Sequence, residues 1–417
     1  MKNNFLLIII LILSVIISSV IFKNNKDQSI NWTFPYFSGA ANYQNLFDWQ
    51  ISPSDFEIAK KLNYTTYKNY KHKKSKITVQ NTVNNYGYVL IVLFARNLFP
   101  QLSEINSVIL FQVLVHLIIS IIIILFILKS SYQKFLFIVL YSSNPLIIHF
   151  VTFPFYYFWL FIPSLSLILI IKRKDCVKNT IPIITLFLLL STLIRPTTIL
   201  LSLFVYIYAF FTTFEKQSKI IIFLSGFTFL LGLLIIKNKS TTTMPFHTMY
   251  VGIGSYPNNF GISSNSDAEG FIYYKKLTGI EISTDAISGN YRIDSIREKY
   301  NLLLKARYFE ILKKDKFLIF KNGTLNFLQT FSFGYYTRSL LINYISSIIG
   351  FIFLIILIIF KKWVFILGIS LYSITYILYF PPIPAYNFGV YLILIMAIID
   401  LMTDLINKKV ISFNILK

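Results

Sequence analysis

Long apolar runs separated by short polar loops cover most of the chain. A helix needs about 20 apolar residues to cross the hydrocarbon core of a bilayer, and such spans are helical or belong to a closed barrel. The pattern therefore predicts an all-α polytopic membrane protein with about ten transmembrane helices. The predicted spans are residues 5–22, 106–128, 135–150, 155–171, 180–194, 197–214, 220–236, 339–360, 364–380 and 388–406.

Two long polar stretches, residues 23–85 and 237–337, interrupt the apolar pattern. Lys and Arg in short loops mark the cytoplasmic side of a membrane protein. All the short basic loops fall on that side if the N-terminus is cytoplasmic, and the C-terminus is then cytoplasmic too. Both long stretches become extracytoplasmic loops in this topology. Their own lysines do not contradict it, because long loops are translocated largely regardless of charge.

The apolar segment 86–100 is short for a membrane span, and Arg96 and Asn97 interrupt it. We expect an interfacial or re-entrant helix here, because one more span would place the basic loops on the wrong side. The first run, residues 5–22, is not followed by a clear small-residue cleavage site. It is therefore interpreted as a retained helix and not as a cleaved signal.

The second long loop is predicted to contain structure of its own. Residues 245–270 are rich in Gly, Asn, Ser and Pro, which favours an irregular, turn-dominated segment. Residues 292–328 place apolar side chains at near-helical spacing among many Lys and Arg. This pattern predicts an amphipathic basic helix on the outer surface.

The formal net charge is +22, in a chain that is 55% hydrophobic with a mean hydropathy of +0.65. This excess predicts anionic membrane lipids as partners. The basic residues are spread between spans and not along one soluble module, which argues against nucleic acid. Acidic residues are rare in the spans, and Asp400 and Asp404 in the last one are expected to form helix-end pairs. The single cysteine, Cys176, excludes an intrachain disulfide.

Two carboxylates in the first long loop, Asp48 and Asp55, are candidates for the general base of a reaction. Aromatic residues surround both, and a carboxylate held against an apolar surface has a raised pKa that suits proton abstraction. Asp55 has a competing explanation, because an Asp before Phe-Glu-Ile-Ala also suits a helix N-cap. Asp48 is therefore the leading candidate.

Arg195 precedes Pro196 between two apolar runs, so a permanent charge lies where a helix must break. The predicted topology puts this break at the outer membrane boundary. The fork of donors on a guanidinium matches phosphate oxygens, which favours a phosphate at headgroup depth. The alternative is an arginine that extends to lipid headgroups with no substrate involved.

The second long loop also carries candidates for binding a sugar. His247 and Asn258 can hydrogen-bond to hydroxyls, and aromatic side chains such as Tyr250 can stack on a sugar ring. Tyr386, in the last outward-facing turn, is a further substrate-binding candidate. In the second long loop, Asp267 follows shortly after Asn258 and forms an acidic pair with Glu269. That pair leaves a divalent metal open, but without a neighbouring His or Cys ligand it does not predict a metal site.

Several of these features together resemble one family of membrane enzymes. They are the large first outer loop, the apolar residues 86–93, the Ser-Asn-Pro-Leu-Ile-Ile segment 143–148, the Arg-Pro hinge within residues 188–198 and residues 247–254. The chain resembles the integral-membrane glycosyltransferases of the GT-C class, which includes protein O-mannosyltransferases and lipid A aminoarabinose transferases. The similarity is greatest to bacterial members from surface-polysaccharide loci.

Two positions depart from the family pattern. Such enzymes usually carry an acidic residue just before a Tyr early in the first loop, and here Ser-Gly-Ala-Ala-Asn-Tyr, residues 38–43, has alanines. The acidic residue often found after the third span is replaced by Thr-Phe-Pro-Phe, residues 152–155. If the resemblance holds, Asp48 performs the role of the first of these acids or the catalytic acid is lost.

The resemblance implies a reaction on the extracytoplasmic face of a bacterial plasma membrane. A sugar would pass from a polyprenyl-phosphate donor to a hydroxyl of a glycan or lipid-linked acceptor, in cell-envelope polysaccharide or glycolipid synthesis. Asp48 would deprotonate the acceptor, and Arg195 with Arg338 would stabilise the departing phosphate. No cofactor is implied beyond the lipid-linked donor.

Two other functions stay open. A polysaccharide polymerase or ligase shares the lipid-linked substrate and should depend on a loop arginine or a histidine such as His247. A transporter or flippase for lipid-linked sugars would need a polar path through the spans and often shows internal repeats. The acid-poor spans and the lack of an evident repeat disfavour the transporter.

Overall fold

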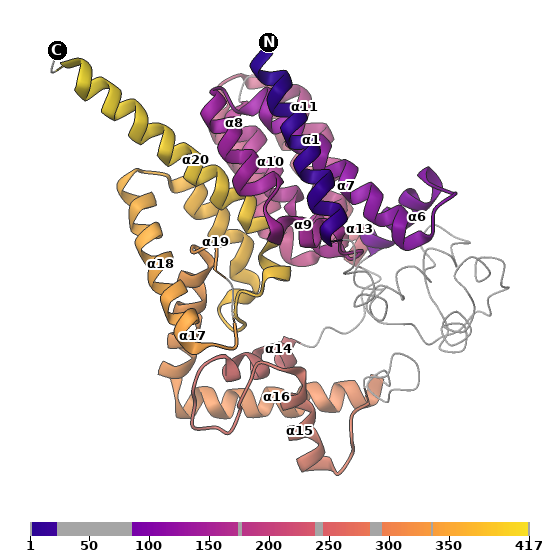
Figure 1. Cartoon of the computed structure of the whole chain (residues 1–417). Coiled ribbons are helices and arrows are strands. Elements are labelled where there is room, and N and C mark those ends of the chain that lie inside the picture. The colour runs from indigo at the N-terminus through magenta and orange to yellow at the C-terminus, as the bar shows by residue number, and fades with distance from the viewer. Residues whose placement is uncertain are drawn as a thin grey trace.

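The computed structural model describes residues 2–22, 86–173, 177–237, 245–283, 294–334 and 337–415. Every element in these ranges is helical, so the all-α prediction is confirmed for this part of the chain. Most helices form an upright bundle, and α14, α15 and α16 form a layer across one end of it (Figure 1). The start of α1 and the end of α20 lie at the opposite end.

The helices are named by their labels in Figure 1, with short π-helical or 3-10 segments marked η. The first half of the chain contains α1 (Lys2–Phe22), α6 (Tyr86–Leu98), α7 (Glu104–Ile122), η2 (Ile123–Ile127), α8 (Ser131–Phe137), η3 (Ile138–Ser142), α9 (Pro145–Thr152), η4 (Tyr156–Phe161), α10 (Ile162–Lys172), α11 (Val177–Ile194), η6 (Pro196–Thr198) and α12 (Ile199–Thr212). The second half contains α13 (Lys216–Lys237), α14 (Pro245–Gly252), η7 (Ile253–Ser255), α15 (Asp267–Thr278), α16 (Asp294–Lys314), α17 (Lys316–Thr330), α18 (Leu340–Ile359), α19 (Trp363–Ile377) and α20 (Pro384–Ile415).

Five helices in the described part are long and apolar enough to cross a membrane. They cover Ile105–Ile127, Val177–Ile194, Lys216–Leu234, Leu340–Ile359 and Pro384–Asn407. The bent pair Ser131–Ser142 and Pro145–Thr152 brings the number to six if it forms one span. The other predicted spans correspond to shorter apolar helices, so the count of ten stays a prediction. Likewise, α6 forms the short helix expected at residues 86–100, and its position relative to a bilayer stays a prediction.

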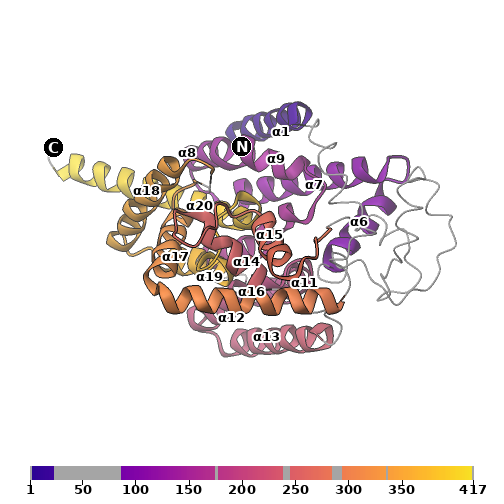
Figure 2. The ribbon, with the colours of Figure 1, turned by 90° about the horizontal axis from the view of Figure 1, so that it is seen from below.

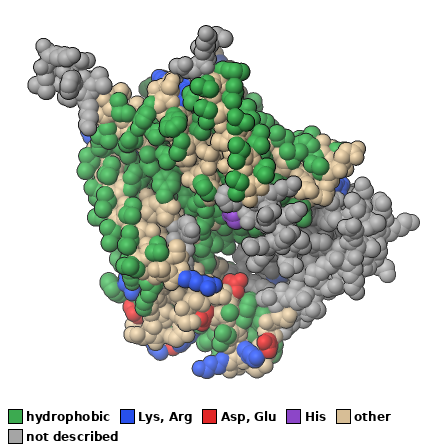
Figure 3. All heavy atoms as spheres, in the orientation of Figure 1, with side chains coloured by type: hydrophobic (Ala, Val, Ile, Leu, Met, Phe, Trp, Pro, Cys, Tyr) green, Lys and Arg blue, Asp and Glu red, His purple; other side chains and the backbone are tan. Residues whose placement is uncertain are grey.

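The outer surface of the bundle is apolar. On the face shown in Figure 3, hydrophobic side chains form a continuous band, and charged side chains gather mainly at the end that carries the α14–α16 layer. The helices α13 and α18 expose large side chains such as Phe223 and Leu234, and Ile348 and Ile352. An apolar surface of this extent would be costly in water, and a lipid environment removes that cost. The protein is therefore a membrane protein.

The third predicted span is not one straight helix. The chain bends by 54° between Ser131–Ser142 and Pro145–Thr152. Asn144 caps the new helix by accepting a hydrogen bond from the backbone N–H of Leu146 at 2.9 Å. Pro145 lacks an N–H and is suited to the first position of a helix, so the Asn-Pro pair ends one helix and begins the next.

The second long loop differs from its prediction in two places. Pro245–Gly252 is the helix α14 and not part of an irregular segment, because Pro begins a helix readily and Tyr250 and Val251 are buried by packing. The single basic helix expected over residues 292–328 is two helices, α16 and α17, divided at Asp315. Asp315 caps α17 by accepting a hydrogen bond from the Leu318 N–H at 2.8 Å.

The helix α16 is also not amphipathic in the predicted sense. It buries Tyr300, Leu304 and Ile311, but exposes the large apolar side chains of Leu302 and Phe309 on its other surface. Apolar residues therefore lie on both sides of the helix. Figure 2 shows α16 crossing the end of the bundle, with α14 and α15 beside it.

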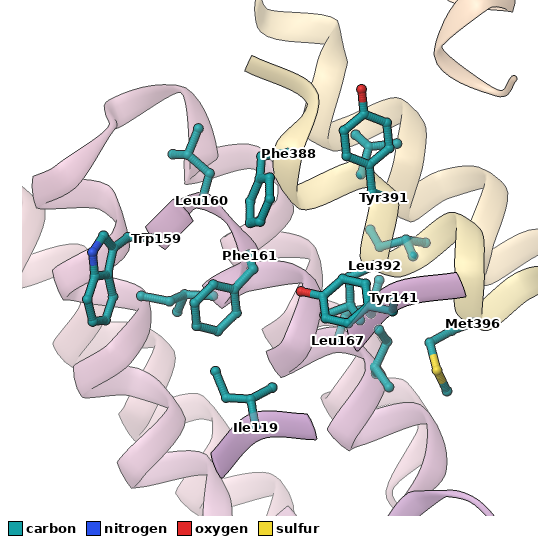
Figure 4. Close-up of a cluster of buried hydrophobic side chains, with 14 of the residues drawn as sticks. Ile119, Tyr141, Trp159, Leu160, Phe161, Leu167, Phe388, Tyr391, Leu392 and Met396 are labelled. Carbon is teal, nitrogen blue, oxygen red and sulfur yellow. The ribbon is translucent and has the colours of Figure 1, made fainter. Parts of the chain in front are cut away.

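The helix α20 runs through the centre of the bundle, and its residues 387–397 are all buried. Figure 4 shows Phe388, Leu392 and Met396 of α20 in a cluster with Tyr141 and Phe161. Toward its other end, Asp400 and Asp404 bind lysines of neighbouring helices. Lys362 lies 2.8 Å from Asp404 and 3.6 Å from Asp400, and Asp400 also pairs with Lys172 of α10. These ion pairs fix α10, α19 and α20 together.

The α14–α16 layer has its own hydrophobic core and is attached closely to the loop between α19 and α20. A Cβ atom on Gly252 would lie 1.8 Å from the Tyr379 carbonyl oxygen, so the two backbones are in direct contact. Asn322 of α17 donates a hydrogen bond to the Ile253 carbonyl at 3.3 Å. The layer is thereby held against the end of the bundle at which α20 begins.

Candidate functional site

Arg195 occupies an extended backbone position between α11 and η6. Pro196 has no N–H to continue the helix, and the hydroxyl of Thr198 donates a hydrogen bond to the Arg195 carbonyl at 2.9 Å. The Arg195 N–H still bonds to the Ser191 carbonyl at 2.8 Å, so the backbone is fixed on both sides of the break. The side chain is half-buried.

The guanidinium of Arg195 lies among tyrosines. Its Nη1 donates a hydrogen bond to the Tyr156 hydroxyl at 3.3 Å, and its Cζ lies 5.6 Å from the centre of the Tyr156 ring and 5.1 Å from that of Tyr386. The Tyr386 ring in turn contacts the Tyr376 ring at 5.8 Å between centres. We call Tyr156, Tyr376 and Tyr386 the tyrosine cup. Such cation–π contacts hold a cation in place without neutralising its charge.

The three residues of the tyrosine cup lie on three different helical elements. Tyr156 begins η4, Tyr376 is near the end of α19, and Tyr386 is in the first turn of α20. The α14–α16 layer also contributes, because Tyr386 packs against the hydrophobic core of that layer. The sequence prediction named Arg195 and Tyr386 independently, and the structure brings them into contact.

Gln112 of α7 holds the irregular backbone that leads into η4. Its Nε2 donates to the carbonyls of Val151 at 2.8 Å and Phe153 at 2.9 Å, and its Oε1 accepts from the Trp159 indole at 3.2 Å. The side chain is fully buried. The sequence analysis missed this residue. A polar residue in an apolar span is the signal that could have found it, since an unsatisfied amide is costly there.

An apolar cavity of about 770 Å³ lies between α6, α7, η4, α10 and α11. Its lining is almost entirely hydrophobic. Phe94, Ile118 and Ile183 line it and are also exposed on the bundle surface, so the cavity opens sideways to the surroundings of the bundle. We call it the apolar cavity.

The apolar cavity leads toward Arg195. Leu190 lines the cavity and precedes Arg195 by little more than one turn of α11. The segment η4 joins the two sites as well, because Tyr156 contacts the guanidinium and Trp159 lines the cavity. A fixed positive charge therefore lies beyond one end of an apolar cavity, which is an arrangement suited to an anionic amphiphile.

His247 and Asp267, both predicted as site residues, also come together. His247 Nε2 lies 3.0 Å from Asp267 Oδ1, and its Nδ1 lies 2.5 Å from the Tyr300 hydroxyl. The hydrogen bond from His247 lowers the pKa of Asp267. With Nε2 donating to the carboxylate, Nδ1 accepts from the tyrosine. Both ring nitrogens are thus engaged, and the contacts tie α14 to α15 and α16.

Two other predicted residues serve the structure of the layer. Asn258 Nδ2 donates to the carbonyls of Ile253, Tyr256 and Ile262, and its Oδ1 accepts from the Phe260 N–H. The Asn258 amide therefore holds a turn, and its role in sugar binding stays a prediction. Tyr250 is buried and packs on Tyr273 at 5.5 Å between ring centres, because the helix α14 turns it into the core of the layer and away from solvent.

The remaining predicted residues lie elsewhere. Arg338 is exposed in the segment before α18. Asp48 and Asp55 lie outside the described residues. Glu269, the expected neighbour of Asp267 in an acidic pair, accepts a hydrogen bond from the Ser263 N–H at 3.1 Å instead of joining Asp267. Within the described ranges, no group of three or more His, Cys, Asp or Glu residues could hold a metal ion.

Comparison with known proteins gives no relative. No protein-family model, curated protein or solved structure matches this chain.

Proposed function

We propose that the protein is a membrane glycosyltransferase. It transfers a sugar from a polyprenyl-phosphate donor to an acceptor hydroxyl on the extracytoplasmic face of a bacterial plasma membrane, in the synthesis of an envelope polysaccharide or glycolipid. The observation that carries the proposal is the position of Arg195 beyond the end of the apolar cavity. A polyprenyl phosphate has the two matching parts, an apolar chain and an anionic head.

The two parts contribute differently to binding. A polyprenyl chain that moves from lipid into the apolar cavity exchanges one apolar environment for another, so it gains little hydrophobic free energy. The cavity therefore selects lipid chains by their shape, and the affinity for the donor comes mainly from its phosphate. A guanidinium can bind phosphate oxygens with two parallel hydrogen bonds, and this interaction is strengthened in a site of low dielectric constant.

Arg195 also has a role in the chemical step. The acceptor oxygen attacks the anomeric carbon while the bond from that carbon to the phosphate oxygen breaks, and the configuration inverts. Negative charge grows on the leaving phosphate, and a guanidinium already in place stabilises it. The proton of the acceptor hydroxyl goes to a carboxylate, for which Asp48 is the candidate and Asp55 the alternative.

The α14–α16 layer supports a site at this end of the bundle. It lies across the end that carries Tyr386, and Tyr386 contacts both the Arg195 guanidinium and the core of the layer, so we expect a sugar bound near Arg195 to lie close to the layer. Asp400, which pairs with Lys172 of α10 and with Lys362 at the start of α19, lies far along α20 from Tyr386. Under the rule that short basic loops face the cytoplasm, the layer is extracytoplasmic.

The proposal is tested first by binding. The purified protein in nanodiscs of zwitterionic lipid should bind farnesyl phosphate much more tightly than farnesol, and Arg195→Ala should abolish this difference. Equal affinity for the phosphate and the alcohol would overturn the role of Arg195.

The second test is transfer. Incubation with radiolabelled polyprenyl-phosphate sugars and a membrane extract as a source of acceptor should release polyprenyl phosphate. Asp48→Asn should stop the release and leave farnesyl phosphate binding unchanged. Release at the wild-type rate in both Asp48→Asn and Asp55→Asn would remove both carboxylates as the base.

A further inference from the structure

Four large apolar side chains on α16 and the first turns of α17 are exposed. Leu302 and Phe309 of α16 are 62% and 42% exposed, and Phe317 and Phe320 of α17 are 72% and 71% exposed. Leu302 and Phe309 are seven residues apart, so they share one side of α16. The side that carries Tyr300 is buried in the core of the layer. We call the four exposed side chains the apolar elbow, and they give α16 a second apolar side.

The apolar elbow lies where the α14–α16 layer meets the bundle. Gly323 follows Phe320 by one turn, and a Cβ atom on it would lie 2.9 Å from the Leu378 carbonyl oxygen at the end of α19. From there α17 runs into the bundle, where its Leu328 carbonyl lies against Gly350 near the middle of α18. The helix α18 is part of the apolar outer surface of the bundle. The first turn of α17 is therefore at the edge of that apolar surface.

The orientation of α16 suits a membrane surface. In Figure 1, α16 lies crosswise to the long helices of the bundle. A bilayer that surrounds the apolar band of the bundle has its surface crosswise to the same helices. The helix α16 is thus roughly parallel to the bilayer surface, which is the orientation of an interfacial helix.

The charge near the apolar elbow is positive. Glu310, a carboxylate on the same stretch of α16, is paired with Arg307 at 2.7 Å and with Lys314 at 2.8 Å. Helices that combine large apolar side chains with lysines bind membranes through both, because the lysines are attracted to anionic headgroups. Three further lysines of this region are exposed: Lys305, Lys313 and Lys316.

We propose that the apolar elbow and these three lysines bind the surface of the surrounding bilayer. The apolar side chains lie among the upper parts of the lipid chains, and the lysines extend to anionic headgroups. Lipid is the occupant because the elbow begins at the edge of the lipid-facing surface of the bundle and α16 is parallel to the bilayer. The contact holds the α14–α16 layer at the membrane and is independent of the substrate that the protein binds.

The contact with lipid is tested by fluorescence quenching. The full chain with Cys176→Ser contains no cysteine, so a nitrobenzoxadiazole label can be attached in Phe317→Cys or Phe320→Cys. In nanodiscs of phosphatidylcholine and phosphatidylglycerol, spin-labelled lipid should quench both labels strongly, and iodide in the buffer should quench them weakly. Leu277→Cys is the matched control, at an apolar side chain that is 52% exposed on α15, which lies farther from the bundle than α14 in Figure 1. Its label should respond in the opposite way.

The lysines are tested in the labelled Phe320→Cys protein. Phosphatidylglycerol should increase the quenching by spin-labelled lipid relative to nanodiscs of phosphatidylcholine alone. Lys313→Gln with Lys316→Gln should lose this increase. Lys275→Gln with Lys276→Gln removes the same charge from α15 and should keep it. All variants should melt as the cysteine-free parent does, because the substituted side chains are exposed.

Three results would overturn the proposal. Lipid quenching of Phe317→Cys and Phe320→Cys no stronger than that of Leu277→Cys would show that the elbow does not reach the bilayer. Shielding of both labels from lipid and from iodide would mean that a protein, such as a second copy of this chain, covers the elbow. An equal response to phosphatidylglycerol in the two lysine variants would refute the role of the lysines. No sugar donor enters these measurements, so the proposed function stands or fails separately.

Discussion

Arg195 lies over the ring of Tyr386, with 5.1 Å between the guanidinium carbon and the ring centre. The contact joins the break after α11 to the beginning of α20, two positions far apart in the chain. An aromatic ring attracts the cation but leaves its charge uncancelled, unlike a carboxylate. The side chain is therefore held in position over the ring.

The ring of Tyr386 matters more than its hydroxyl in this arrangement. Tyr386→Phe should keep the affinity for farnesyl phosphate close to the wild-type value, and Tyr386→Leu should lower it by about twofold to thirtyfold, since one partly desolvated cation–π contact contributes about 0.5–2 kcal/mol. Titration of each variant measures the difference. Lys129→Ala, at an exposed lysine in the short loop before α8, is the control for general loss of positive charge. A loss in Tyr386→Phe equal to that in Tyr386→Leu would contradict the ring contact.

Gln112→Leu should destabilise the bundle and disturb the site. It leaves the Val151 carbonyl and the Trp159 indole without the Gln112 side chain, and each buried group left unsatisfied costs about 1–3 kcal/mol. The Phe153 carbonyl loses its bond to Gln112 but keeps the one from the Phe155 N–H. We expect a clear fall in the melting temperature of the variant. We also expect the change in tryptophan fluorescence on farnesyl phosphate binding to differ between the variant and the wild type. Gln101→Leu, the same change at an exposed turn position, should melt as wild type does. Indistinguishable melting of the two variants would show that the Gln112 bonds contribute nothing.

Gly252→Ala should loosen the α14–α16 layer. An added Cβ would lie 1.8 Å from the Tyr379 carbonyl oxygen, which is backbone and cannot move away alone. We expect faster cleavage of the layer by protease and a large loss of sugar transfer. Gly226→Ala is the matched control, because its Cβ would meet no atom closer than 3.6 Å. Protease resistance of Gly252→Ala equal to that of the control would disprove the close docking.

The hydrogen bond between His247 and Asp267 predicts a dependence of stability on pH. It lowers the pKa of Asp267 in the folded protein relative to the unfolded chain. Such a group stabilises the fold above its unfolded pKa, and this contribution is lost as the pH falls through the folded value. The melting temperature of the wild type should therefore fall more steeply than that of Asp267→Asn below about pH 4.

The difference in the pH experiment should be small, because Asp267 is exposed and its interactions are screened by solvent. Melting curves recorded from pH 3 to 7 for the two proteins provide the measurement. Parallel curves over this range would show that the hydrogen bond does not persist in solution.

The position of most helices followed from local sequence. The apolar runs predicted most of the bundle helices, and the Arg195-Pro196 pair predicted the break between α11 and η6. Local signals also existed where the prediction was wrong. Asn144 before Pro145 divides the third span, and Asp315 begins α17, in each case through a side-chain cap that acts over two or three residues. These features depend only on neighbours in the chain.

The candidate site was predictable only in part. The residue type and the helix break singled out Arg195, but its partners Tyr156 and Tyr386 come from distant elements. Equally, the polar and aromatic character of Asn258 and Tyr250 suggested sugar binding, and only packing showed that one holds a turn and the other fills a core.

The sequence by itself determined that this is a helical membrane protein with a charge at a helix break, because hydropathy and proline act within a few residues. The tertiary structure decided what surrounds that charge. Packing of α20 through the centre of the bundle brings Tyr386 to the end of α11, and the bend before η4 positions Tyr156 beside it. The tyrosine cup exists only because η4, α19 and α20 meet at the end of α11, and side-chain packing over the whole bundle brings them together.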